Sequence, residues 1–201
     1  MSNKLFAKEL FNKHVFKDGI FYNNYISHKM ASFKEFWKWR KESTKSDPIS
    51  FPLAKNDPAF LQQNRTEKTL TWIGHASFLL QVDGLNILTD PHLTKRASPV
   101  FFAGPSRTTP PGLSIDDLPD IDIIVISHNH YDHLDYQTML KIMRKQQGNP
   151  PLVLVPLKLK KLLQSFGASN VKELEWWEST SYKNLKIHSV PVQHWSNRSF
   201  N

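Results

Sequence analysis

Apolar residues between 69 and 194 fall in short blocks, as in strands of a layered domain. Two β-prone runs within residues 69–91 flank the turn Val82-Asp83-Gly84, and Asp-Gly between such runs predicts a hairpin. The short continuous apolar runs at 121–127 and 151–156 are typical of strands buried on both faces. A further strand is expected over 185–194, leading into His194.

Two other segments have a helical pattern of apolar residues. One extends from Leu134 to Gln147 and is followed by Gly148, and the other, 157–167, ends at Gly167. Strands that alternate with helices indicate an α/β class with layered packing, in which strand ends carry polar residues into a site. The loop 98–112, rich in Pro and Gly, is longer than a connector needs and is a candidate functional segment.

The region before the first predicted strand differs in composition and periodicity from the rest of the chain. Residues 1–66 are predicted to be a basic, aromatic extension, and residues 67–201 the α/β domain. Helical spacing relates four residues of the extension: Phe33, Phe36, Trp37 and Arg40. This amphipathic helix either packs its aromatic stripe on the core or touches a membrane surface. An extended connector is expected at three prolines: Pro48, Pro52 and Pro58.

Composition narrows the class of protein. Hydrophobic residues make up 39% of the 201 residues and charged residues 22%, so a folded core is expected. The absence of cysteine excludes disulfides and thiolate metal sites. No secretory signal or membrane span is recognisable, and we expect a cytoplasmic protein, with peripheral membrane contact as an alternative. The net charge of +8 either favours anionic partners or only promotes solubility.

The segment Ser127–Asp135, SHNHYDHLD, directly follows an apolar run and contains three histidines and two aspartates. Imidazole nitrogen and carboxylate oxygen both suit Zn²⁺. Residues two apart in an extended segment point the same way, so His128 and His130 can hold one ion together. Asp132 and His133 can point toward a second position, and two ions roughly 3.5–4 Å apart could share and activate one water.

The motif His-x-His-x-Asp-His, over residues 128–133, resembles the signature of the metallo-β-lactamase superfamily. Further short matches resemble the branch that contains N-acyl-phosphatidylethanolamine-hydrolysing phospholipase D and its bacterial relatives. These matches are 71–76 (TWIGHA), 88–91 (LTDP), 96–99 (RASP), 104–105 (GP), 110–111 (PP), 155–157 (VPL), 175–178 (EWWE) and 193–195 (QHW). The resemblance implies an αββα sandwich, of which this chain would contain the first half and an N-terminal extension.

The resemblance also implies roles for individual residues. His128, His130 and His194 would bind the first zinc ion, and Asp132 and His133 the second. His194 is expected at a strand end, where α/β proteins place site residues. Asp90 either orients a ligand imidazole beside the site, so that it acts in catalysis with Asp132 and His133, or forms an Asp-Pro turn.

Two further histidines, His75 and His92, are interpreted as structural residues, with a place in the cleft as the alternative. The family's second zinc also needs a bridging carboxylate, but no Asp, Glu or His follows His194 in these 201 residues. One or two zinc ions are therefore expected here. Three upstream histidines stay open as substitutes: His14, His28 and His188.

The function implied is that of a zinc-dependent phosphodiesterase in which a metal-bound hydroxide attacks an N-acyl-phosphatidylethanolamine-like phospholipid. A non-catalytic metal-binding remnant is the alternative, and a lactonase or nuclease of the same superfamily is a third hypothesis. Nucleic acid is not an expected partner, because no array of basic and aromatic residues is recognisable. A fragment or truncated product is expected, with the inner faces of its strands open to water and a capacity for self-association.

Overall fold

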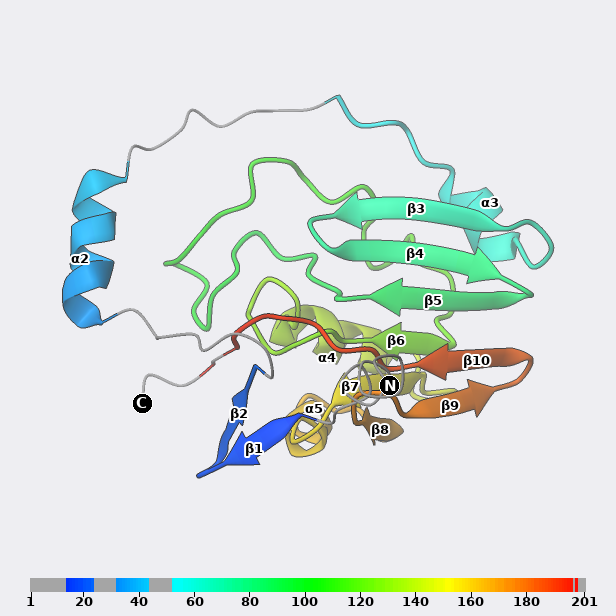
Figure 1. The fold of residues 1–201 in the computed structure, drawn as a ribbon. Helices are drawn as coiled ribbons and strands as arrows, with labels where there is room; N and C mark the ends of the chain where they lie inside the picture. Colours follow the sequence, from blue (N-terminus) through cyan, green and yellow to red (C-terminus); the bar gives the residue numbers. More distant parts are fainter. Residues whose placement is uncertain (1–13, 24–31, 44–51, 197, 199–201) are drawn as a thin grey trace, which may run out of the picture.

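The computed structural model describes residues 14–23, 32–43, 52–196 and 198. Its centre is a six-stranded mixed sheet in which spatial order follows chain order (Figure 1). The strands are β3 (Thr69–Gly74), β4 (Ser77–Val82), β5 (Leu85–Thr89), β6 (Ile123–Val125), β7 (Leu152–Pro156) and β8 (Val171–Leu174). The strands from β3 to β5 pair antiparallel, and those from β5 to β8 pair parallel.

Helices form the crossovers between the parallel strands. Helix α4 (Tyr136–Lys145) joins β6 to β7, and α5 (Lys160–Ser165) joins β7 to β8. The carboxylate of Asp135 caps α4 by accepting hydrogen bonds from the backbone N–H groups of Gln137 and Thr138. The apolar faces of these helices meet one face of the sheet in a core that includes fully buried Leu134 and Met139. The predicted α/β class is therefore confirmed.

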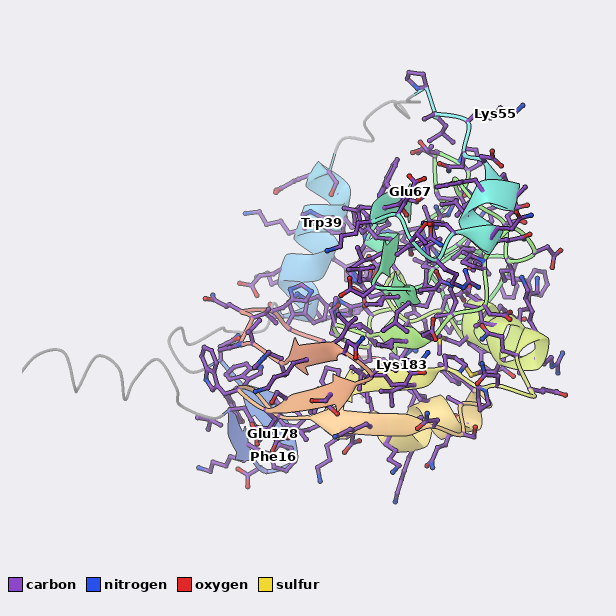
Figure 2. All side chains as sticks on the ribbon, turned by 90° about the vertical axis from the view of Figure 1, so that its right-hand side faces the viewer. Phe16, Trp39, Lys55, Glu67, Glu178 and Lys183 are labelled. Atoms are coloured by element: carbon purple, nitrogen blue, oxygen red, sulfur yellow. The ribbon has the colours of Figure 1, made fainter. Side chains whose placement is uncertain are left out.

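A hairpin of β9 (Ser179–Tyr182) and β10 (Leu185–His188) covers part of the opposite face. Figure 2 shows the hairpin and α4 on opposite sides of the sheet. Here Leu185 and Ile187 pack against a second apolar cluster that includes Ile123. The expectation that the inner faces of the central strands are open to water is wrong for β5, β6 and β7, because almost all their residues are buried.

Apolar exposure on this face is concentrated on β3. Leu70 is 67% exposed and Trp72 42% exposed, and they pair across the strands with Leu80 and Phe78. Self-association through this face stays a prediction.

Short elements precede the sheet: β1 (Val15–Lys17), β2 (Ile20–Tyr22), α2 (Phe33–Glu42) and α3 (Pro58–Gln63). Helix α3 lies before the predicted domain boundary at residue 67, but its Leu61 is buried in the main core. The side chain of Asn64 donates hydrogen bonds to buried Gln81 and to the backbone of Glu67. Residues just before the predicted boundary thus contribute to the core.

The helix predicted around Phe33 and Trp37 is present as α2, with Ser32 and Glu35 forming a capping box. Phe33 is 76% exposed and Trp37 is 46% exposed. Packing of these two rings on the core is therefore not observed. Of the three prolines in the predicted connector, Pro48 lies outside the described residues, and Pro58 is the first residue of α3.

Two strand predictions need correction. The segment 69–82 forms two strands and not one, because Gly74 and His75 adopt positive φ values of 145° and 52° and turn the chain. The strand expected to run into His194 ends at His188, and residues 189–194 are irregular. Pro191 has no backbone N–H to offer a sheet, which is consistent with pairing that ends before it.

Candidate metal centre

The centre lies where β5 and β6, neighbouring parallel strands, deliver their carboxyl ends to one edge of the sheet. Asp90 follows β5 and is 6% exposed. Its Oδ1 accepts from the backbone N–H of Ser127 at 2.7 Å, and its Oδ2 accepts from Ser127 Oγ at 2.7 Å. The same Oδ2 lies 2.9 Å from Nδ1 of His133. Asp90 therefore has the position expected of a group that orients an imidazole.

The first donor group consists of His128, His130 and His194, each of which offers one ring nitrogen within 4.8 Å of the others. Nε2 of His128 lies 2.9 Å from Nδ1 of His130. The ring of His194 stands nearly perpendicular to both, with centroid distances of 4.6 Å to His128 and 5.2 Å to His130. The structure thus brings together three residues that the sequence assigned to one ion, and the ligand role itself stays a prediction.

Contacts beyond His194 hold it in this place. Ser196 Oγ hydrogen-bonds with Asn129 in the segment Ser127–Asp135, which we call the histidine loop. The guanidinium of Arg198 lies 4.2 Å from the ring centroid of Tyr131, and its Nη2 donates to the backbone carbonyl of Leu134 at 2.7 Å. Docking of this segment, rather than a strand end, positions His194.

The second donor group consists of His75, Asp132 and His133, again within 4.8 Å of one another. Nε2 of His75 lies 3.0 Å from Oδ2 of Asp132 and 3.4 Å from Nε2 of His133. Nε2 of His133 lies 3.8 Å from the same carboxylate oxygen. Asp132 and His133 were predicted together, whereas His75 was interpreted as structural. The Gly-His pair between two β-prone runs was the available signal for a turn that presents this ring.

The two groups are adjacent. The ring of His128 in the first group and the ring of His133 in the second lie 4.1 Å apart between centroids. Two cations held by the two groups would therefore be close neighbours, as in two-metal sites.

Electrostatics in the first group favour neutral imidazoles. Burial lowers the pKa of His128 to about 4, and the positive charges that His133, His130 and His194 would carry add to the effect. Burial likewise lowers the pKa of His130, again with help from His194. Neutral imidazole is the form that binds metal, so these two rings are prepared for a cation without first losing a proton.

The second group differs. The hydrogen bond to Asp90 raises the pKa of His133 against the effect of burial. Burial acts to raise the pKa of Asp132, but a backbone hydrogen bond and the nearby His133 and His75 outweigh it, so the pKa is lowered. Asp132 is therefore an anion at neutral pH, whereas His133 takes up a second proton at a higher pH than an ordinary histidine, and that proton competes with a metal for Nε2.

The residues fit divalent metal ions. Nδ1 of His133 faces a carboxylate, so it carries the proton and leaves a lone pair on Nε2. Ser127 Oγ lies 2.9 Å from Nδ1 of His128 and occupies that side of the ring. The other ring nitrogen, Nε2, therefore faces His130 and the first donor group. Outer partners of this kind fix the orientation of metal-binding imidazoles. Three nitrogen donors, or two with one carboxylate, match the three protein ligands of catalytic zinc sites.

Comparison with known proteins agrees with this geometry. The family model described as "Beta-lactamase superfamily domain" matches residues 85–201, which include the loop of the first histidines and His194. An uncharacterized protein of Mycobacterium tuberculosis is 34% identical over 164 residues, which cover 81% of this chain and 43% of that protein.

The chain belongs to the beta-lactamase superfamily.

Two other proteins that are similar to this chain carry functional names. N-acyl-phosphatidylethanolamine-hydrolyzing phospholipase D 1 of Caenorhabditis elegans is 41% identical over 134 residues, covering 62% of this chain and 37% of that protein. A crystal structure titled as a possible metal-dependent hydrolase from Veillonella parvula is 26% identical with a TM-score of 0.48, covering 60% of this chain and 47% of that one. The chain spans less than half the length of the curated relatives described.

The other histidines that the structure describes lie outside both donor groups of this superfamily domain. His14 contacts the carboxylate of Glu175, His188 is exposed at the end of β10, and His28 lies outside the described residues. His92 is 4% exposed and adjoins Arg107, and burial lowers its pKa. The expectation of a structural role therefore fits the buried His92 better than the half-exposed His75.

A cavity of about 340 Å³ opens beside the first donor group. His128 and His194 contribute to its wall. Its apolar lining includes Leu157, Leu159, Leu174, Trp176, Val192 and Trp195. Lys158 supplies a positive charge, and residues 21–23 of the β1–β2 hairpin close one side. The site thus joins a polar centre to an apolar chamber.

Proposed function

We propose that this domain belongs to a metal-dependent hydrolase that cleaves a phosphodiester of N-acyl-phosphatidylethanolamine-like lipids. The observation that carries the proposal is the pair of adjacent donor groups, each with three candidate donor side chains. Three protein ligands leave a coordination position for water or substrate on each ion. The match to relatives named for hydrolysis of this lipid supports the substrate class.

Bound divalent cations would supply activation of water and stabilisation of negative charge on the phosphoryl oxygens. The residues of this chain do the rest. His128, His130 and His194 hold one cation, while Asp132 and His133 hold the other. Asp90 accepts a hydrogen bond from the Nδ1–H of His133, which fixes that ring, and it ties the loop to β5 by accepting from the backbone N–H of Ser127.

The apolar cavity supports a lipid substrate. A phosphodiester placed at the donor groups would extend its acyl part past His194 toward Trp176 and Leu157. Lys158 would face the anionic headgroup region, and the net charge of +8 favours approach of an anionic substrate. Removal of apolar surface from water stabilises such a complex by roughly 25 cal/mol per Å².

Peripheral contact with a lipid surface is part of the same proposal. Phe101 and Phe102, in the long loop, are 90% and 70% exposed, and Arg96, just before the loop, donates a hydrogen bond to the carbonyl of Gly104. Exposed aromatic rings with nearby cations favour the bilayer interface. No described helix is long and apolar enough to cross a bilayer. Sedimentation with anionic vesicles, and loss of binding in the Phe101→Ser/Phe102→Ser variant, tests this part.

The test of the hydrolase is an assay of the 201-residue chain, loaded with Zn²⁺, against three substrates: N-acyl-phosphatidylethanolamine vesicles, an acyl lactone and a short RNA. Turnover of the lipid that a chelator abolishes supports the proposal. Turnover of the lactone alone or of the RNA alone would contradict the lipid substrate and indicate a lactonase or a nuclease instead. His130→Ala is the matched inactive variant, because it removes one nitrogen of the first group.

A second candidate is a metal-binding domain without turnover. It is favoured by the fact that Asp132 is the only carboxylate in either three-residue donor group of the described chain. Two-metal hydrolases use a pair of neighbouring ions to stabilise both the attacking and the leaving oxygen. A domain that holds its ions with a single carboxylate could therefore bind metal without this pairing. Stoichiometric metal with no product from any of the three substrates would support this candidate.

A further inference from the structure

We propose that His75 is a third protein ligand of the second metal ion, completing with Asp132 and His133 a three-donor site. The inference rests on the two-ion centre proposed above and extends it to a residue that lies more than fifty positions before the histidine loop. The position would take a divalent cation of the Zn²⁺ type, since its donors are two imidazole nitrogens and one carboxylate oxygen.

The geometry of the donor atoms is the first argument. Nε2 of His75 lies 3.0 Å from Oδ2 of Asp132 and 3.4 Å from Nε2 of His133. Nδ1 of His133 carries its proton toward Asp90, so its Nε2 presents a lone pair to His75. Two imidazole nitrogens and an anionic oxygen that converge in this way form one face of a tetrahedral site. The half-exposed side chain of His75 leaves the fourth direction open.

The backbone is the second argument. His75 has a φ of 52°, in the left-handed region, where histidine is more frequent than most other non-glycine residues. Such conformations cost roughly 1–3 kcal/mol each and persist where the surrounding structure enforces them. Six other described non-glycine residues also have positive φ, so this conformation alone assigns no role; what distinguishes His75 is that its turn aims the ring at Asp132 and His133.

Neighbouring contacts enforce that conformation from both sides. The carbonyl of Ala76 accepts a hydrogen bond from Thr89 Oγ1 at 2.8 Å, and Ser77 Oγ donates to the carbonyl of Asp90 at 2.7 Å. The turn that carries His75 is thus tied to the end of β5, the same segment that orients His133. One rigid support therefore sets both imidazoles.

Arg107, from the long loop, holds the other side of the turn. A Cβ atom at Gly74 would lie 2.7 Å from its Nη1, so the guanidinium fits against this glycine only because it has no side chain. Nε of Arg107 donates to the carbonyl of Thr94 at 3.0 Å, and Nη2 donates to the carbonyl of His92. The long loop 98–112 therefore has a structural role, because its Arg107 positions the Gly74–His75 turn.

An ion pair between His75 and Asp132 without any metal role is the competing explanation. Exposed pairs of this kind contribute only about 0–1 kcal/mol to stability. The two explanations also differ in a measurable way. A ligand contributes to metal affinity, whereas an ion pair would be broken by a metal and would weaken binding.

The experiment uses the 201-residue chain and its His75→Asn variant, titrated with Zn²⁺ in calorimetry and with Co²⁺ followed by visible absorption. Asn tolerates the left-handed conformation, so the turn is retained. His188→Asn, at the exposed end of β10, is the matched control. Circular dichroism verifies that both variants fold, and His75→Gln provides a second test if the Asn variant does not.

We expect two ions per wild-type chain and per control chain. In His75→Asn the second ion should bind at least about tenfold more weakly, with an altered Co²⁺ spectrum, while the first ion is unchanged. Equal affinities in wild type and variant, tighter binding in the variant, or a single wild-type ion unaffected by the change would each overturn the inference. If His130→Ala also binds metal as wild type does, the proposed centre itself fails, and the two failures are thereby distinguished.

Discussion

The two donor groups of this domain offer similar atoms but are built differently. The first, His128, His130 and His194, contains nitrogen only, and burial holds the pKa of His128 and His130 low. The second, His75, Asp132 and His133, contains an anion and a histidine whose pKa the carboxylate of Asp90 raises. Two rings of the first group, His128 and His130, are thus held in the neutral form that binds a cation, whereas at His133 in the second group protons compete with the cation.

Their supports differ as well. His194 reaches the first group through contacts of Ser196 and Arg198 with the histidine loop, outside any strand. The second group is fixed at the sheet, where Thr89 and Asp90 at the end of β5 hold the turn of His75 and the ring of His133. A site of this kind therefore depends on one docked segment and on one rigid edge. Variants that disturb only one of these supports should change the affinity for one ion and leave that for the other nearly unchanged.

The largest effect is expected from His130→Ala. Loss of one of three nitrogens should weaken the first ion by more than about 100-fold, because removal of an outer partner alone typically costs 10–100-fold. The second ion should keep its affinity within severalfold. Calorimetric titration with Zn²⁺ measures both, with His188→Asn as the control. Equal weakening of the two ions would mean that the groups are not separate sites.

Asp90→Asn should weaken mainly the second ion, whereas His130→Ala weakens mainly the first. The neutral amide would replace the charged acceptor of the hydrogen bond from Nδ1–H of His133. The affinity for the second ion should therefore fall by about 10–100-fold. The first ion should change less, although Ser127 also loses a charged acceptor. The same titration checks this result. An affinity for the first ion that falls more than that for the second would contradict the assignment of Asp90 to His133.

Acidification should separate the two ions without any mutation. Because the pKa of His128 is about 4, protons do not compete for this ring near neutrality. The pKa of His133 is raised, so this ring gains a proton as pH falls and must lose it to bind metal. Between about pH 7 and about pH 5.5 the second ion should weaken by about tenfold and the first by less than about threefold. Titrations at several pH values measure this, and a steeper loss at the first group would contradict it.

Gly74→Ala should give the smallest change in metal binding. The added Cβ would contact Arg107 and strain a residue with a φ of 145°, which should lower the free energy of unfolding by about 1–3 kcal/mol. Displacement of His75 should weaken the second ion severalfold and leave the first unchanged. Urea unfolding and Zn²⁺ titration measure the two effects. Gly148→Ala, with open space around its Cβ position, is the matched control.

Local patterns in the sequence predicted much of this domain. The continuous apolar runs at β6 and β7 and the turn before β5 are where the pattern placed them. The loop from His128 to His133 is local, so its spacing alone predicted which side chains would converge. Asp90 could be predicted because it follows a strand, and parallel strands gather their ends at one edge.

Long-range contacts account for what the pattern missed. His75 joins the second group through a turn with positive φ, which residue type alone does not predict for histidine. The place of His194 was expected at a strand end but depends on Arg198, whose partners lie on the histidine loop. The cover of β5–β7 by the β9–β10 hairpin follows from tertiary packing of Leu185 and Ile187 rather than from local periodicity.

The most direct test of the centre is anomalous diffraction at the zinc edge from crystals of the 201-residue chain grown with Zn²⁺. The account predicts two neighbouring peaks. One should lie among Nε2 of His128, Nδ1 of His130 and the ring of His194, and the other among His75, Asp132 and His133. Zinc found only at other residues, with neither group occupied, would contradict it.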